Sequence, residues 1–183
     1  DKETKEKIES LIPNFCDEKF ILLTEENQQQ SELIPFYKHN EKEYTRITLV
    51  GSESVGKTSI ITRYVHDQFN DYMESTIAGA NSRKEELSIW DTSGNEDYEC
   101  LIPMFTRGSK SVMFVFDLSN LESFHKLIDM KKELNNSIND KDTILILVGN
   151  KCDLKREVNK ELAENFAIEN NMIYFEVSAK SNS

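Results

Sequence analysis

Apolar and polar positions change their spacing in a regular way along the chain from about residue 45 onward. Short β-rich runs alternate with longer segments in which apolar residues recur at helical spacing. Three of the runs, at 112–116, 143–148 and 173–177, are almost continuously apolar, which is typical of parallel strands covered on both faces. Shorter runs at 46–50 and 87–90 are further predicted strands.

Helical patterns separate these runs. One predicted helix passes through Ile60, Ile61 and Tyr64, a second covers 122–136, and a third covers 159–170. A helix is the usual connection between neighbouring parallel strands, so this order predicts an α/β fold. We expect a doubly wound, mostly parallel sheet with helices on both faces.

The first 44 residues do not follow this alternation. Residues 5–12 have the spacing of a short amphipathic helix, and residues 19–23 have the spacing of a strand. Residues from about 24 to 35 are polar and rich in Gln, as in a loop or linker. We therefore predict an N-terminal extension over 1–44, followed by a main domain over 45–183.

The chain is acidic, with a formal net charge of −11 over 183 residues. This charge repels a phosphate backbone, so nucleic acid is not an expected partner. A local group of backbone N–H donors can still bind a nucleotide in an acidic protein. The sequence has no apolar stretch of membrane-spanning length and no secretory signal at its start, so we expect a cytoplasmic location.

A phosphate-binding pattern, GxxxxGK[ST], runs from Gly51 to Thr58. It stands directly after a predicted strand and directly before a predicted helix, as such a loop must. Lys57 supplies positive charge to the terminal phosphates, and the Thr58 hydroxyl can bind Mg²⁺. The alternative is a chance glycine-rich turn, which the flanking elements make the weaker interpretation. The residues expected to contact nucleotide here are Ser54, Val55, Gly56, Lys57, Thr58 and Ser59.

A carboxylate follows the predicted strand at 87–90. Asp91 would lie at the carboxyl edge of the sheet, beside the first strand, where it can bind Mg²⁺ through water. Gly94 could donate its N–H to a γ-phosphate. Taken alone, an Asp that ends a strand is as readily a turn former, so the interpretation of Asp91 depends on the other motifs.

The loop after the strand at 143–148 carries Asn150, Lys151 and Asp153. A carboxylate can accept hydrogen bonds from N1–H and from the exocyclic amine of guanine, whereas adenine has no such pair of donors. Lys151 can lay its aliphatic stem along a base, and Asn150 can tie this loop to the phosphate loop. An ordinary polar turn is the alternative. Together with the other elements, the loop indicates a guanine-binding site.

These motifs stand in the order and at the spacings of the Ras-superfamily GTPases, which the chain resembles over residues 45–183. The Rab branch is the most similar, through Trp90 in the WDTSG string and through segments 105–108 and 115–124. The resemblance implies a P-loop small GTPase fold, Mg²⁺ as cofactor and GTP or GDP as ligand. The residues that carry it are Gly51, Gly56, Lys57, Thr58, Thr76, Asp91 to Gly94, Asn150 to Asp153, Ser178, Ala179 and Lys180.

The resemblance also implies roles for single residues. Phe69 matches the aromatic residue that packs against guanine, although without the other motifs a plain core aromatic would be preferred. The Ala179 N–H matches the group that reads the guanine oxygen. Thr76 matches the switch threonine that binds Mg²⁺ only with GTP. Contacts of Thr76 and Gly94 with the γ-phosphate would order two loops, through which effector, exchange-factor and activating proteins would recognise the nucleotide state.

Two positions depart from the family in ways that bear on hydrolysis. Asn95 stands where the family usually has a glutamine that orients the attacking water, and its side chain is one methylene shorter. Glu53 and Ser54 stand where the family often has glycine, and the glutamate adds bulk and negative charge near the γ-phosphate. We expect slow hydrolysis and impaired activation by activating proteins. The expected catalytic residues are Asn95, Lys57 and Gly94, and the expected metal ligands are Thr58, Thr76 and Asp91.

Further departures concern the fold. The chain between Thr76 and Asp91 is shorter than in the family, so we predict a second strand that is short or disordered. The family's final helix has no counterpart before Ser183. Either the sequence is truncated, or the polypeptide has lost this helix, or the predicted helix at 5–12 fills its place. A prenylation motif is also missing, so peripheral association with endomembranes would need a segment outside this sequence.

Three functions are weighed against these residues. A Rab-like, GTP-hydrolysing switch in vesicle traffic is the leading one. A nucleotide-binding scaffold with negligible turnover is the alternative, which Glu53 and Asn95 make credible. Retention of Thr58, Thr76 and Asp91 favours the switch, because a scaffold has no need to sense a γ-phosphate. A P-loop kinase is disfavoured by the guanine-binding loop and by the lack of an arginine-rich lid.

Overall fold

One mixed sheet organises the part of the chain that the computed structural model describes, residues 44–183 without 74, 78, 85 and 139–142. Its strand order is β2-β3-β1-β4-β5-β6. Neighbouring strands are parallel, except that β2 and β3 are antiparallel. The strands are β1 (Thr45–Val50), β2 (Gly79–Lys84), β3 (Leu87–Thr92), β4 (Ser111–Asp117), β5 (Ile144–Asn150) and β6 (Ile173–Glu176). The predictions for residues 1–43 lie outside the described residues.

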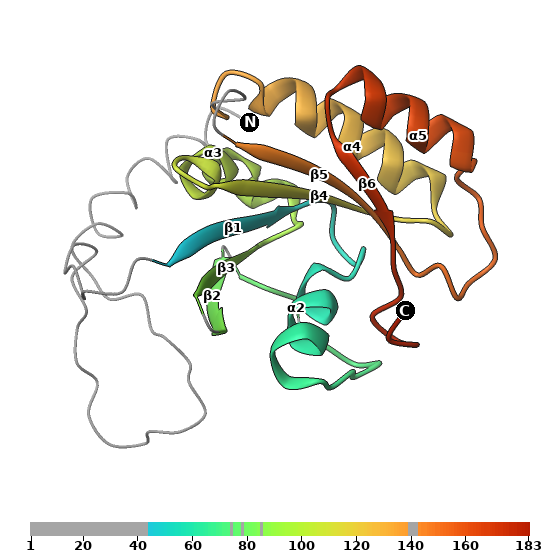
Figure 1. The fold of residues 1–183 in the computed structure, drawn as a ribbon, viewed down its shortest axis with the longest axis horizontal. Helices are drawn as coiled ribbons and strands as arrows, with labels where there is room; N and C mark the ends of the chain where they lie inside the picture. Colours follow the sequence, from blue (N-terminus) through green and yellow to red (C-terminus); the bar gives the residue numbers. More distant parts are fainter. Residues whose placement is uncertain (1–43, 74, 78, 85, 139–142) are drawn as a thin grey trace. The chain divides into compact units, whose positions relative to one another are not determined.

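Helices lie on both faces of the sheet (Figure 1). The pair α4 and α5 packs on one face, and α2 packs on the other. Two asparagines begin the paired helices, because Asn120 accepts a hydrogen bond from Ser123 N and Asn159 accepts one from Glu161 N. The helices are α2 (Lys57–His66), α3 (Ile102–Thr106), α4 (Leu121–Leu134) and α5 (Lys160–Glu169), with a 3₁₀ helix η1 (Glu96–Leu101) before α3. The predicted doubly wound α/β fold is confirmed, whereas η1 and α3 were not predicted.

The second strand corrects one prediction. We expected it to be short or disordered, but β2 has six residues, as many as β1 and β3. Its small and polar residues show no alternation of apolar and polar positions, so this segment carries no strand pattern. Antiparallel pairing with β3 decides the conformation instead, and Asn81 Nδ2 donates to Ser88 Oγ across the pair at 2.8 Å.

Two apolar clusters hold the layers together. The larger one lies between the sheet and the helices α4 and α5, where Phe114 and Phe116 of β4 and Phe124 and Leu127 of α4 are fully buried. The smaller one lies under α2 and includes Ile61 of that helix. Because strands β1, β4 and β5 are buried on both faces, their carboxyl ends are held rigidly in place.

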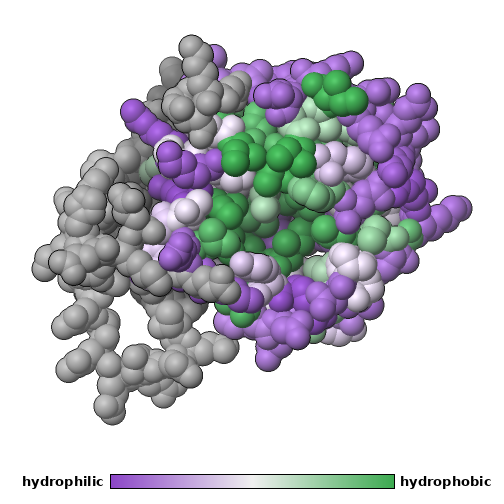
Figure 2. Space-filling view, viewed as in Figure 1, coloured by the Kyte–Doolittle hydropathy of each residue, from purple (hydrophilic) through white to green (hydrophobic). Residues whose placement is uncertain are grey.

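Toward β6, the face that carries α2 presents apolar side chains of the described residues. Ile144, Ile173 and Phe175 are 56%, 51% and 53% exposed. Ile146 packs against the cluster under α2, and register pairs it with Ile173. Ile144 and Phe175 are two residues away along the same strands, so all of these side chains lie on that face. Figure 2 shows hydrophobic side chains gathered over the sheet. The hypothesis that a helix at 5–12 fills the place of the family's final helix lies outside the described residues.

In the part of the chain that the structure describes, every helix is too short or too polar to cross a bilayer.

Candidate functional site

The predicted site residues lie at one edge of the sheet, where the parallel strands end. The loops after β1, β3, β5 and β6 meet there around a pocket of about 400 Å³, as expected for the carboxyl edge of a doubly wound sheet. Thus segments that are far apart in sequence form one concave surface. The predicted residues that line it are Ser54, Gly56, Lys57, Thr58, Ser59, Phe69, Thr76, Gly94, Asn150, Lys151, Asp153, Ser178, Ala179 and Lys180.

Three predicted residues lie elsewhere. Val55 is buried in the cluster under α2, so its side chain supports the phosphate loop from behind. Asp91 is 4% exposed and reaches the site only through the hydroxyls of Thr58 and Thr76. Asn95 lines a neighbouring pocket of about 330 Å³, which shares Glu53 and Gly94 with the first.

The phosphate loop depends on two glycines. Gly51 and Gly56 have φ angles of 150° and 92°, which L side chains rarely adopt. A Cβ at Gly51 would lie 2.1 Å from Val115 O, and a Cβ at Gly56 would lie 2.4 Å from Asn150 Nδ2. The loop therefore passes too close to β4 and to the Asn150 side chain at the end of β5 for any larger residue at these positions.

Lys57 is held inside the loop by backbone oxygens. Its Nζ donates to Gly51 O at 2.7 Å and to Ser52 O at 2.8 Å, and the residue is 5% exposed. Burial lowers the pKa of Lys57 to about 8, against the opposing attraction of Asp91 and Glu53. A phosphate group in the pocket would favour the charged ammonium and raise this pKa.

Thr58, Thr76 and Asp91 converge at the start of α2. Asp91 Oδ2 accepts hydrogen bonds from Thr58 Oγ1 at 2.5 Å and from Thr76 Oγ1 at 2.8 Å, and the two hydroxyl oxygens are 3.0 Å apart. Burial raises the pKa of Asp91, while the two hydroxyls and Lys57 oppose this rise. Asp91 Oδ1 is buried and has no hydrogen-bond partner among the described residues. An unpaired buried oxygen beside two hydroxyls is a donor set that suits Mg²⁺.

The end of the pocket where we expect the base is built from the loops after β5 and β6. Asn150 Nδ2 donates to Val55 O at 2.8 Å, which is the predicted tie between this loop and the phosphate loop. Asn150 Oδ1 accepts from Ala179 N at 3.4 Å, and Ser178 Oγ donates to Asp153 Oδ1 at 2.5 Å. The loop after β6 therefore holds the Asp153 carboxylate in place.

Phe69 lies beside these loops, half-buried. Lys180 Nζ is 5.8 Å from the centre of the Phe69 ring and forms an ion pair with Asp71 at 3.0 Å. Arg63 of α2 donates through Nε to Ala179 O at 2.9 Å. These contacts join the segment after α2 to the loop after β6 around the expected position of the base.

Asn95 and Glu53 are both engaged in hydrogen bonds. Asn95 Oδ1 caps η1 by accepting from Asp97 N at 2.9 Å, and Glu53 Oε1 accepts from Ser75 Oγ at 2.7 Å. Gly94 lies against the phosphate loop, since a Cβ on it would lie 2.3 Å from Glu53 N. The loop after β3 thus packs directly on the position where the glutamate stands.

Sequence reasoning missed Asp117, Ser75 and Arg63 as contributors to the site. Asp117 ends a buried strand next to β1, which is the same signal that identified Asp91, but no role was assigned to it. Ser75 and Arg63 gave no signal, because their contacts with Glu53 and Ala179 join distant segments.

The comparisons with known proteins agree with one another. The sequence model of the Ras family matches residues 46–183. The GTP-binding protein ypt5 of Schizosaccharomyces pombe is 38% identical over 148 residues, which are 74% of this chain and 70% of that protein. The Ras-related protein Rab-5A of Dictyostelium discoideum is 37% identical over 146 residues, 74% of this chain and 72% of that protein.

Proposed function

Because the chain belongs to the Ras family, and is Rab-like within it, we propose that it is a Mg²⁺-dependent switch that binds GTP and GDP and hydrolyses GTP slowly. We further propose that it regulates vesicle traffic from the cytoplasm, peripherally on endomembranes. The two relatives are named for GTP binding and for their Rab type, which supports this assignment.

The observation that carries the proposal is the contact of Thr58 and Thr76 with one carboxylate oxygen of Asp91. These residues come from α2, from the segment before β2 and from β3. A nucleotide that competes for this cluster would move the segment around Thr76, and a partner protein could detect the movement. A scaffold that only holds nucleotide has no use for this connection.

The chain's own residues supply binding and orientation. Lys57 places a buried ammonium beside the terminal phosphates, and the phosphate loop presents backbone N–H groups to them. Asp153, held by Ser178, accepts hydrogen bonds from guanine. Thr58, Thr76 and Asp91 would hold Mg²⁺, which neutralises phosphate charge when bound.

The proposed slow hydrolysis rests on Asn95 and Glu53. Hydrolysis requires an amide that orients the attacking water, and the Asn95 amide is short and already caps η1 through its oxygen. The Glu53 carboxylate stands in the phosphate loop, where its negative charge opposes charge that develops on the phosphate. Both features favour slow hydrolysis of bound GTP.

Partner proteins would read the loops around Thr76 and Gly94. Tyr72 and Ile77, on either side of the threonine, are 91% and 77% exposed. Exposed aromatic and aliphatic side chains beside a nucleotide-sensing residue suit an interface for effector, exchange-factor and activating proteins.

Binding and turnover measured together test the proposal. Titrations with GDP, GTP and ATP, each with Mg²⁺ or with a chelator, should show Mg²⁺-dependent binding of the guanine nucleotides alone. Phosphate release should be detectable and slow. Equal binding of ATP and GTP would contradict the guanine specificity, and binding that ignores Mg²⁺ would contradict the switch.

A nucleotide-binding scaffold remains the second candidate function. The capping role of Asn95 favours it, because this side chain is diverted from the pocket that Lys57 and Thr58 line. The same experiment separates the two functions: a scaffold binds guanine nucleotide and releases no phosphate.

A further inference from the structure

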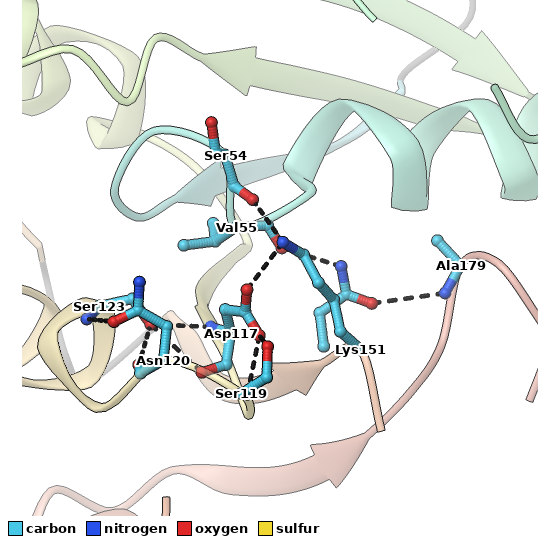
Figure 3. Close-up of polar contacts among 9 residues, drawn as sticks. Ser54, Val55, Asp117, Ser119, Asn120, Ser123, Lys151 and Ala179 are labelled. Carbon is cyan, nitrogen blue, oxygen red and sulfur yellow. Dashed lines mark hydrogen bonds and ion pairs between the residues drawn. The ribbon is translucent and has the colours of Figure 1, made fainter. Parts of the chain in front are cut away.

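The Asp117 carboxylate at the end of β4 is hydrogen-bonded on both oxygens. Its Oδ1 accepts from Ser119 N at 2.8 Å and from Ser119 Oγ at 2.6 Å. Its Oδ2 forms an ion pair with Lys151 Nζ at 2.7 Å (Figure 3). Asp117 is 7% exposed, so this carboxylate is removed from water and aimed at one cation.

Lys151 connects this carboxylate to the phosphate loop. The same Nζ donates to Ser54 O at 2.8 Å, so the ammonium lies between a carboxylate and a phosphate-loop carbonyl (Figure 3). Sheet register brings the two residues together, because Asp117 is paired with Asn150, which directly precedes Lys151. Lysine has a flexible four-carbon stem, and two fixed acceptors restrict it to one conformation.

The backbone of Asp117 is anchored from the other side. Its N–H donates to Ser123 Oγ at 3.0 Å, and that hydroxyl donates to Asn120 O at 2.7 Å. Asn120 in turn caps α4 (Figure 3). The carboxylate is therefore fixed to the start of a helix that packs on the core, and it can position the long lysine side chain.

We propose that Asp117 is a positioning residue for the bound guanine nucleotide, acting through Lys151. It holds the lysine ammonium on Ser54 O, which fixes the phosphate loop and leaves the aliphatic stem along the base site. This inference rests on the proposed guanine-nucleotide binding. Among the described residues, the Asp117 side chain forms its hydrogen bonds and ion pair with Ser119 and Lys151 and none with Thr58, Thr76 or Asp91, so its removal affects GDP and GTP equally.

Nucleotide dissociation tests the proposal. Asp117→Asn keeps the size and the two Ser119 hydrogen bonds but removes the charge that holds Lys151. Dissociation of a fluorescent GDP and of a non-hydrolysable GTP analogue should each accelerate about tenfold, the size expected for one charge-assisted hydrogen bond at a partly exposed site. The matched control is Asp129→Asn, which breaks an exposed ion pair with Lys132 on α4 and should leave both rates unchanged.

A double-mutant cycle separates positioning from general support of the fold. If Asp117 acts through Lys151, then Asp117→Asn changes the dissociation rate by less than about twofold in a Lys151→Met background. If Asp117 had a purely structural role, the factors by which Asp117→Asn and Lys151→Met change the dissociation rate would multiply in the double mutant. The inference would be overturned if the two effects multiply, or if Asp117→Asn alone leaves the dissociation rate unchanged. The proposed function would still stand in either case, provided that the parent protein binds guanine nucleotide.

Two further outcomes are also decisive. A parent protein that binds no guanine nucleotide removes the proposed function and this inference with it. If Asp117→Asn does not fold, as judged by circular dichroism, Ser119→Ala replaces it, because this change removes one hydrogen bond to Oδ1 and retains the charge. An increase of about threefold in dissociation, abolished in Lys151→Met, then supports positioning, and an unchanged rate refutes it.

Discussion

Ser75 donates its hydroxyl hydrogen to Glu53 Oε1 at 2.7 Å, so the segment that leads to Thr76 is tied to the phosphate loop by a side chain. In this loop, glycine would offer no such tie, because it has no side chain. The glutamate therefore has two separable consequences, a negative charge at the phosphate site and a contact with the segment expected to switch.

Hydrolysis should accelerate when either departure from the family is reversed. Glu53→Gly removes the negative charge, and Asn95→Gln lengthens the amide by one methylene so that it can reach a water. We expect each to raise the single-turnover rate about tenfold, since positioning and electrostatics supply most of the catalysis in phosphoryl transfer. The measurement is release of labelled phosphate from γ-labelled GTP.

Ser75→Ala is the control for that experiment. It removes the contact with Glu53 but keeps the charge, so hydrolysis should stay near the parent's rate if the charge is the cause. The interpretation of both positions is wrong if neither Glu53→Gly nor Asn95→Gln accelerates hydrolysis.

Thr76→Ala should separate GTP from GDP. Loss of the hydroxyl removes one of the three groups of the Thr58, Thr76 and Asp91 cluster. We expect affinity for a non-hydrolysable GTP analogue with Mg²⁺ to fall about tenfold, and affinity for GDP to change little. Isothermal titration calorimetry with both ligands measures this difference. Equal losses for the two nucleotides would mean that Thr76 does not sense the γ-phosphate.

Asp153→Asn should change the choice of base. The carboxylate accepts two hydrogen bonds from guanine, whereas an amide presents donors that suit the carbonyl at the corresponding position of xanthine. We expect GDP affinity to fall at least about 100-fold, because a site built for specific hydrogen bonds rejects a mismatched partner strongly. Competition between GDP and XDP for the variant reports the change. If GDP remains preferred, the base is read by another residue.

Gly51→Ala should destabilise the fold. Gly51 combines a φ of 150° with a Cβ position 2.1 Å from Val115 O, so a methyl group forces the loop away from β4. We expect a loss of about 3 kcal/mol in the free energy of unfolding, measured with urea. Gly108→Ala is a matched control, because Gly108 has φ 76° but nothing within 4 Å of its Cβ position. The control should lose only about 1 kcal/mol, the cost of left-handed backbone alone.

Acid should weaken one ion pair on the surface. Hydrogen bonds from Arg156 lower the pKa of Glu176, which also accepts from Tyr174 OH at 2.8 Å. A carboxyl with a lower pKa in the folded state stabilises the fold above its unfolded pKa, and this contribution is lost as pH falls through the folded pKa. Glu176→Gln should therefore cost about 0.5 kcal/mol at pH 6 and almost nothing at pH 3, because the pair is partly exposed.

Urea unfolding at both pH values measures this effect. Glu164→Gln is the matched control, since Glu164 pairs with Lys160 on an exposed helix face at 3.7 Å. It should cost little at either pH. A Glu176→Gln variant with the same loss at both pH values would show that charge is not the cause.

That most of the motif residues line one pocket could be predicted because each motif is local. Gly51, Gly56, Lys57 and Thr58 lie within one loop, and the loop's position between a strand and a helix follows from hydrophobic spacing. Asn150 and Asp153 follow a buried strand for the same reason. Once parallel strands are predicted, their carboxyl ends must lie at one edge of the sheet. A pocket formed by the loops at that edge is therefore expected from the sequence alone.

Other features could not be predicted because they depend on pairing between distant segments. β2 forms because β3 offers an antiparallel edge, and its own residues carry no strand pattern. Asn95 caps η1, a helix that the spacing of apolar residues did not indicate. Hence the sequence could place Asn95 in the loop after β3 but could not give the direction of its amide.

By itself, then, the sequence determined the fold class, the edge that carries the site and the motif residues, because these depend on short-range spacing. Only the tertiary structure decided which side chains form ion pairs and hydrogen bonds with one another. Lys151 has Asp117 as its partner because register aligns the ends of β4 and β5, and Glu53 has Ser75 because two loops converge. Such contacts join residues that are distant in the chain, and they form only when the strands have paired and the loops at their ends have come together.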